Sequence, residues 1–250
     1  MRALRLYAGP AAMARIAREG LQSADIGTIA GAAGGPKGLI LGPLDRFLFG
    51  QWLPQSDQAV DLVGASIGAW RMATACLDES VARFEQLEHD YIHQDYALSP
   101  GQARPTPEMV SETFGRNLHA FYGPRAAQVL SHPRYRLHVV TARGRHLLGR
   151  EHRLRTPLGY LGAFLTNSVH RKAMGAWLER VVFSTAGAAL PFDCSDYRTR
   201  QVRLSEANFH PALQASCSIP FMLRAVQHIP GAPAGAYWDG GITDYHLHLN

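Results

Sequence analysis

Apolar positions in this chain form strand-like runs in some segments and recur at helical spacing in the segments between them. Four runs have the apolar content and the length of strands, at residues 25–33, 59–63, 135–142 and 200–204. Apolar residues recur at helical spacing in the segments between them, at 10–19, from 39 onward, 67–77, 78–98, up to about 130 and 209–216. Strands that alternate with helices predict an α/β fold around a largely parallel central sheet.

Proline and glycine mark the limits of several predicted elements. Pro10 suits the first turn of a helix that ends before Gly20, and Pro43 must lie in the first turn of the helix after residue 39. Three prolines make residues 99–107 a loop. Residues 156–183 alternate glycine-containing and helical pieces, and within them 176–182 fits a helix or a strand equally well.

A candidate nucleophile lies between a predicted strand and a predicted helix. Gly64-Ala65-Ser66-Ile67-Gly68 fits the G-x-S-x-G pattern, in which a tight strand-to-helix turn exposes a serine hydroxyl. The small residues on either side of the serine suit the crowding at such a turn. We therefore interpret Ser66 as a nucleophile in preference to part of a structural Gly-Ser turn.

The base that would activate this serine is expected much later in the chain. Asp239-Gly240-Gly241 lies 173 residues after Ser66 and places a carboxylate on a glycine-rich turn, where the backbone can come close to another loop. A serine hydroxyl needs an adjacent base to become a useful nucleophile. The two segments together predict a serine acyl hydrolase.

A glycine-rich segment, Gly34-Gly35-Pro36-Lys37-Gly38, follows the first predicted strand. Backbone N–H groups in such a segment can stabilise the oxyanion of an acyl-transfer intermediate. A phosphate-binding loop is excluded, because Pro36 and Gly38 stand where that motif requires Gly and Ser or Thr. The dinucleotide-binding fingerprint also fails, since Ala33 occupies its first glycine. A plain turn is the remaining alternative.

The order of these segments resembles the patatin-like phospholipase family. That family uses G-G-G-x-[RK]-G for its oxyanion hole, which residues 33–38 match except at Ala33. Ala215-Ser216-Cys217-Ser218-Ile219-Pro220 is similar to the family's A-S-x-A-x-P segment. These two segments, the G-x-S-x-G turn and Asp-Gly-Gly fall in family order across residues 33–241. The family commonly continues with Asn and Pro, where this chain has Ile242 and Thr243.

The resemblance implies a three-layer α/β/α sandwich and a catalytic dyad without a metal or an organic cofactor. Ser66 would be the nucleophile and Asp239 the general base, with Gly34 and Gly35 donating to the oxyanion. Lys37 and Gly38 would support the glycine loop, and the turns would depend on four further glycines, Gly64, Gly68, Gly240 and Gly241. The expected substrates are fatty-acyl esters of phospholipids and neutral lipids.

Composition places the chain among ordinary globular proteins and predicts one domain over residues 1–250. Hydrophobic residues make up 46% and charged residues 18% of the chain. Three scattered cysteines predict neither a disulfide framework nor a zinc site, and the first residues lack the apolar region of a secretory signal. We expect a cytoplasmic protein. The sequence ends nine residues after Asp-Gly-Gly, and we expect a C-terminus shortened relative to the family.

Positive charge is concentrated in the middle of the chain, within a formal net charge of +5. The basic cluster consists of Arg134, Arg136, Arg143, Arg145, Arg150, Arg153, Arg155, Arg171 and Lys172. No nucleic-acid-binding motif accompanies it, so we do not expect a nucleic-acid partner. Peripheral contact with an anionic membrane surface is the expected role, and a solvated basic face is the alternative.

Three alternatives to a hydrolase with a Ser-Asp dyad stay open at this point. A Ser-His-Asp triad could combine Ser66 with Asp193 or Asp196 and with one of three histidines, His210, His228 or His246. An acyltransferase would use the same acyl-enzyme, and a non-catalytic lipid-binding protein would use the same scaffold. A metal site at His246 and His248 is not expected, because no third ligand is evident.

Overall fold

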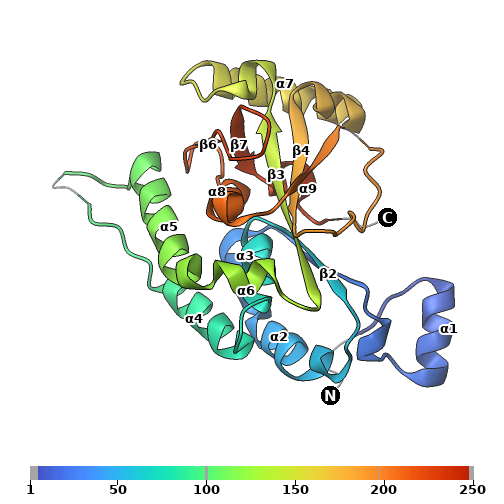
Figure 1. Ribbon diagram of the computed structural model, residues 1–250. Helices are drawn as coiled ribbons and strands as arrows, with labels where there is room; N and C mark the ends of the chain where they lie inside the picture. The colour runs from blue at the N-terminus through green and yellow to red at the C-terminus, as the bar shows by residue number, and fades with distance from the viewer. Residues whose placement is uncertain (1–4, 99–100, 197, 248–250) are drawn as a thin grey trace.

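The computed structural model describes residues 5–98, 101–196 and 198–247 (Figure 1). Within these ranges the helices are α1 (Pro10–Glu19), α2 (Gly42–Phe47), α3 (Ile67–Ala75), α4 (Ser80–Ile92), α5 (Pro107–Tyr122), α6 (Ala126–Leu130), α7 (Arg155–Val169), α8 (Glu206–Ser216) and α9 (Gly241–Asp244). The strands are β1 (Thr28–Gly31), β2 (Val60–Ala65), β3 (Tyr135–Gly144), β4 (Leu178–Ser184), β5 (Thr199–Arg203), β6 (Val226–Gln227) and β7 (Ala236–Asp239). Strands and helices alternate, as the sequence pattern predicts for an α/β fold.

The sheet is mostly parallel along its main path, β1-β2-β3-β4-β5. The pairs β1–β2, β2–β3 and β4–β5 are parallel, and β3–β4 is antiparallel. The short strands β6 and β7 form an antiparallel pair that joins the sheet through β3. The long strand β3 carries β2 on the first part of one edge and β7 on the rest of that edge.

Helices cover the two faces of the sheet unequally. Alternate strand residues such as Leu137, Val139 and Phe183 face a large core formed with α3, α4, α5, α6 and α8. The opposite face is covered by α7 over Ala142 and Trp238, and by Leu190, Phe192 and Leu247 over Val63 and Val140. Figure 1 shows α7 lying across the end of β3 and β4, apart from the large group of helices. The arrangement is a three-layer sandwich, as predicted.

Glycine and proline account for the main differences in predicted boundaries. The strand expected at 25–33 shortens to β1, because it gives way to a loop in which Gly34 and Gly35 have φ of 152° and 55°. The helix expected from residue 39 is a 3₁₀ turn at Gly35–Leu41 followed by α2, with Pro43 in its first turn. The undecided segment 176–182 is largely β4, whose residues are all buried.

Candidate active site

The site lies where two strands meet end to end on one edge of β3. Ala65, the last residue of β2, is opposite Val140, and Asp239, the last residue of β7, is opposite Thr141. Because β2 runs parallel to β3 and β7 runs antiparallel to it, the carboxyl ends of both strands point at the same place. Ser66 and Asp239 are thereby brought together from positions far apart in the sequence.

Ser66 occupies a sharp turn between β2 and α3. Its backbone has φ of 56° and ψ of −131°, a conformation that residues with a side chain rarely adopt and that stores about 1 to 3 kcal/mol of strain. A Cβ at Gly68 would lie 1.7 Å from the carbonyl oxygen of Gly31, and one at Gly64 would lie 2.4 Å from Cα of Ala69. The two glycines of the motif are therefore required by the close approach of β1, β2 and α3.

Asp239 is a buried carboxylate in which one of the two oxygens has a hydrogen-bond partner and the other has none. Oδ1 accepts a hydrogen bond of 2.7 Å from the N–H of Gly241, and Oδ2 is buried without a hydrogen-bond partner. Burial raises the pKa of Asp239 to about 6, against the lowering effects of the Ser66 hydroxyl and the Gly241 N–H. The carboxylate is thus ionised near neutral pH and adjacent to the serine, as a general base must be.

The segment after Asp239 is held against β3 and the glycine loop. A Cβ at Gly240 would lie 2.1 Å from the carbonyl oxygen of Val140, and one at Gly241 would lie 2.6 Å from Cβ of Ala33. The N–H of Ala33 donates to the carbonyl of Tyr245 at 3.0 Å. The glycine loop, the serine turn and the Asp-Gly-Gly turn therefore form one contiguous site.

Residues at the end of α8 connect the nucleophile to the base. The hydroxyl of Ser216 accepts from the N–H of Ser66 at 2.9 Å and donates to the carbonyl of Val140 at 2.7 Å. The carbonyl of Ser216 accepts from the N–H of Gly240, and the carbonyl of Ser218 accepts from the N–H of Asp239. The predicted A-S-x-A-x-P resemblance gave no role to Ser216, which holds both halves of the dyad in place.

Three backbone N–H groups of the glycine loop and the serine turn have no hydrogen-bond partner among the described residues, as the donors of an oxyanion hole require. The N–H groups of Gly34, Gly35 and Ile67 donate to no other group among the residues that the structure describes. Gly34 and Gly35 are the predicted donors, and Ile67 adds the N–H at the start of α3. Ile67 was missed in the sequence, although the residue after the nucleophile is a common oxyanion donor in G-x-S-x-G enzymes.

The remaining residues of the glycine loop have different surroundings. Ala33, which replaces the first glycine of the family pattern, does not have a positive φ, so its side chain fits without backbone strain. Gly38 is buried and packs on Ile67, where a Cβ would lie 2.7 Å from Cγ2. Lys37 is exposed, and no ion pair joins it to a described residue.

The groups of the alternative triad lie in other surroundings. His210 stacks on His119 with ring centroids 4.0 Å apart, and His228 is exposed. His246 is exposed and contacts the ring of Tyr245. Asp193 accepts from the hydroxyl of Ser195, and Asp196 pairs with Arg180. The carboxylate next to Ser66 is that of Asp239.

Two further side chains, to which no sequence motif gives a role, border Ser66 and Asp239. Burial raises the pKa of the Cys217 thiol, Asp239 raises it further, and the Ser66 hydroxyl acts in the opposite direction. Burial likewise raises the pKa of Tyr160 on α7, with Asp239 adding to the shift, and its hydroxyl is buried without a partner. Both groups stay neutral, so Asp239 is the charged group of the site.

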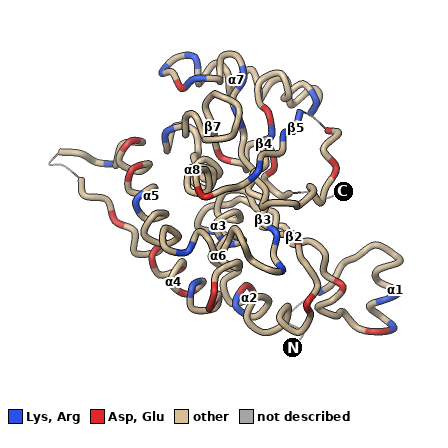
Figure 2. Tube along the Cα trace, viewed as in Figure 1, with Lys and Arg blue, Asp and Glu red and all other residues tan. Residues whose placement is uncertain are grey.

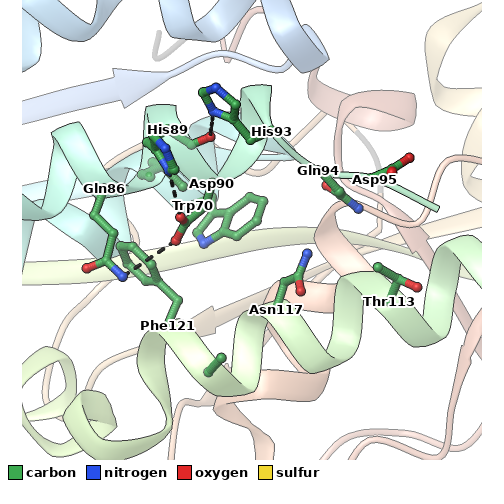
Figure 3. Close-up of a pocket in the computed structure, with 12 residues that line it drawn as sticks. Trp70, Gln86, His89, Asp90, His93, Gln94, Asp95, Thr113, Asn117 and Phe121 are labelled. Carbon is green, nitrogen blue, oxygen red and sulfur yellow. Dashed lines mark hydrogen bonds and ion pairs between the residues drawn. The ribbon is translucent and has the colours of Figure 1, made fainter. Parts of the chain in front are cut away.

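A separate cavity of about 390 Å³ lies between α4 and α5 (Figure 3). His89 and Asp90 line it from α4, His93 lines it directly after that helix, and Asn117 and Phe121 line it from α5. Trp70 reaches it from α3, one turn after Ser66. Neither member of the dyad is among its lining residues, so the cavity is distinct from the candidate active site.

The predicted basic cluster divides into paired and exposed members. Arg136 pairs with Asp61, Arg143 with Glu179, and Arg171 with Asp196, while Arg134 and Arg145 donate to backbone carbonyls. Four other members are exposed and form no ion pair with a described residue: Arg150, Arg153, Arg155 and Lys172. About half of the cluster thus serves the fold.

Neither a metal-binding cluster nor a membrane-spanning helix is found among the described residues. Over residues 5–98, 101–196 and 198–247, no three or more His, Cys, Asp and Glu side chains are grouped so that they could hold a metal ion. His248 of the predicted His246–His248 pair lies outside these ranges. No helix in the same ranges has both the length and the apolar content needed to cross a bilayer.

Comparison with known proteins adds no assignment. No protein-family model matches the chain, and no curated protein sequence matches it. The function proposed below is therefore inferred from the residues and the geometry of the site.

Proposed function

We propose that this protein is a serine hydrolase that cleaves fatty-acyl esters of lipids through an acyl-enzyme on Ser66. The observation that supports this most directly is the end-to-end meeting of β2 and β7 on β3. It sets a strained serine beside a buried carboxylate that has one oxygen without a partner. Strain and an unsatisfied buried group together are typical of a catalytic site.

The reaction follows from the positions of these groups. Asp239 takes the Ser66 proton as Oγ attacks the ester carbonyl, and the oxyanion that forms accepts from the N–H groups of Gly34, Gly35 and Ile67. Collapse of the intermediate breaks the ester bond, and the Asp239 proton passes to the leaving alcohol oxygen. Water then attacks the acyl-enzyme and gives a proton to Asp239, and this proton returns to Ser66 Oγ as the Oγ–acyl bond breaks and the fatty acid leaves.

The sequence resemblance supports the lipid class of substrate and the dyad together. The same four segments that resemble the patatin-like phospholipases are the ones that converge on Ser66 in space. The location expected from the sequence, the cytoplasm with peripheral contact at a membrane, is part of the proposal.

Covalent labelling with a fluorophosphonate, measured by intact mass, tests the proposal. We expect stoichiometric labelling of the native protein, none of Ser66→Ala, and labelling slowed by about 10²- to 10⁴-fold in Asp239→Asn, the range for loss of a general base. A folded native protein that is not labelled would overturn the proposal in favour of a non-catalytic lipid-binding protein. Labelling that survives Ser66→Ala would show a different nucleophile.

A further inference from the structure

The helix α7 presents its small residues to the protein and its large apolar residues to solvent. Its buried side consists of Thr156, Gly159 and Ala163. Its outer side and the residue before it carry side chains that are 54% to 87% exposed: Leu154, Leu158, Leu161, Phe164, Leu165 and Val169. A surface helix of a globular protein normally has the reverse arrangement. An exposed apolar surface of this kind indicates an interaction site.

Close packing fixes α7 with this face outward. A Cβ at Gly159 would lie 2.6 Å from Cδ2 of Leu148, and one at Gly162 would lie 2.6 Å from the ring of Trp177. A larger residue at either position would collide with the Leu148 or Trp177 side chain, which would have to move. The two glycines therefore let α7 lie close against Leu148 and Trp177, with its leucines on the outer side.

Both ends of the exposed face are basic. Arg153 and Arg155 are exposed at the start of α7, Lys172 is exposed just after its end, and α7 itself contains no Asp or Glu. In Figure 2 the tube along α7 is tan, with Lys and Arg segments near its two ends. The nearby Glu151 pairs with Arg224, so it does not neutralise the start of the helix. An apolar face with basic ends matches an anionic bilayer surface, where Lys and Arg meet headgroups and the apolar side chains enter the acyl boundary.

The apolar surface continues from α7 to the catalytic segment. Tyr160, on the inner side of α7, contacts the rings of Trp238 and Phe221, with centroids 5.9 and 6.0 Å apart. Phe221 and Met222 are about 60% exposed. They follow Ser218, whose carbonyl accepts from the N–H of Asp239. A surface that rests on α7 and Phe221 would therefore lie next to the dyad.

We propose that α7, together with Phe221 and Met222, docks on an anionic lipid bilayer with the helix axis in the plane of the membrane surface. Docking brings lipid esters to the Ser66 site. This supply of substrate rests on the proposed function, whereas the binding of the bilayer does not. A second copy of the chain is a poorer occupant of the face. Two α7 helices packed through it would bring the basic ends of the copies together.

Vesicle flotation of the Ser66→Ala protein tests docking independently of activity. The vesicles contain either phosphatidylcholine alone or a mixture of phosphatidylcholine and phosphatidylglycerol. We expect binding to the anionic vesicles that weakens with added salt, and at least about tenfold weaker binding for the double variant Leu158→Asp/Leu165→Asp. The matched control is Ile92→Asp, because Ile92 is 67% exposed on α4, far from α7 in Figure 1.

A second pair of variants separates charge from apolar contact. Arg153→Glu/Arg155→Glu should weaken binding to the anionic vesicles, whereas Arg18→Glu/Arg116→Glu changes the net charge equally on distant helices and should leave most of the binding intact. Undiminished binding by both α7 variants would overturn the proposal. So would a dimer in solution that the α7 variants dissociate, because a second copy would then cover this face. Vesicle binding without any fluorophosphonate labelling of native protein would uphold docking and refute the hydrolase.

Discussion

Two buried arrangements of a serine and a carboxylate lie at opposite ends of β2, and their chemistry differs. At the beginning of the strand, Asp61 accepts from Arg136 at 2.6 and 2.7 Å and contacts Nε2 of His138 at 3.0 Å, while Nδ1 of His138 is 2.9 Å from the Ser184 hydroxyl. This group has the composition of a Ser-His-Asp triad. At the other end, Ser66 has only Asp239, one of whose oxygens has no hydrogen-bond partner.

The difference between the two arrangements explains why the proposed function uses Ser66 and not Ser184. Every polar group of the Asp61–His138–Ser184 network has a partner, His138 is fully buried, and burial lowers its pKa, partly offset by Asp61. Such a network is a stable part of a core. The Ser66–Asp239 pair keeps backbone strain and an unsatisfied oxygen, both of which a substrate or a transferred proton can use. A selection by residue types alone would favour Ser184, which is not the serine that the proposed function uses.

Replacing each serine in turn should give the largest difference between the two ends of β2. We expect Ser66→Ala to lower kcat/KM on a fatty-acyl ester by at least about 10³-fold, since it removes the nucleophile. Ser184→Ala should leave kcat/KM within about threefold, because Ser184 is buried away from the site, at an ordinary cost of a buried hydrogen bond. Ester hydrolysis by both purified, folded variants would measure this. Equal losses would show that the two serines act together.

Replacing the two carboxylates should change stability in opposite directions. The pKa of Asp239 is about 6 in the folded protein against a usual 3.8, so keeping it ionised costs up to about 3 kcal/mol above pH 6. Asp239→Asn should raise the free energy of unfolding at pH 7, and the gain should disappear as the pH falls to about 4. Asp61→Asn should lower it by about 2 kcal/mol, because Arg136 and His138 lose an ionised partner. Urea titrations at pH 7 and pH 4 distinguish the two, and a destabilised Asp239→Asn would contradict the assigned environment.

Ser216, at the end of α8, should affect catalysis more than substrate binding. Ser216→Ala removes the acceptor for the Ser66 N–H, so the nucleophile loses its fixed position and kcat should fall by about 10- to 100-fold with little change in KM. Ser218→Ala is the matched control, because the Ser218 hydroxyl donates only to the backbone carbonyl of Gln214, in the preceding turn of the chain. Steady-state kinetics of both variants decide the point. A similar loss of kcat in both variants would show that Ser216 has a general structural role only.

The pH dependence of the reaction should give the smallest but most specific signal. Because Asp239 must be ionised to accept the Ser66 proton, kcat/KM should rise about tenfold per pH unit up to about pH 6 and then level off. A pH–rate profile on a neutral ester measures this. An inflection near the usual pKa of a free carboxyl would contradict burial of the base, and one that Asp239→Asn leaves unchanged would indicate a different base.

Local sequence patterns predicted the parts of this site that depend on neighbouring residues. The strand, turn and helix around Ser66 were predicted because apolar period and small residues act over a few positions. Ser216, Tyr160 and the shared edge of β3 were not, because they depend on which distant strands pair and in which register. The outward face of α7 was also missed, since helical spacing alone does not show which side packs.

The shared edge of β3 also has a consequence for the order of folding. β2 and β3 are separated by about 70 residues of chain, whereas β7 reaches the same edge only after about another 90 residues have been arranged. Contacts between such distant segments form slowly, because closing long loops costs entropy before any contact repays it. Ser66 and Asp239 therefore come together only once β7 has docked. The recovery of fluorophosphonate labelling during refolding would time that event directly, separately from the earlier collapse of the helices onto β2 and β3.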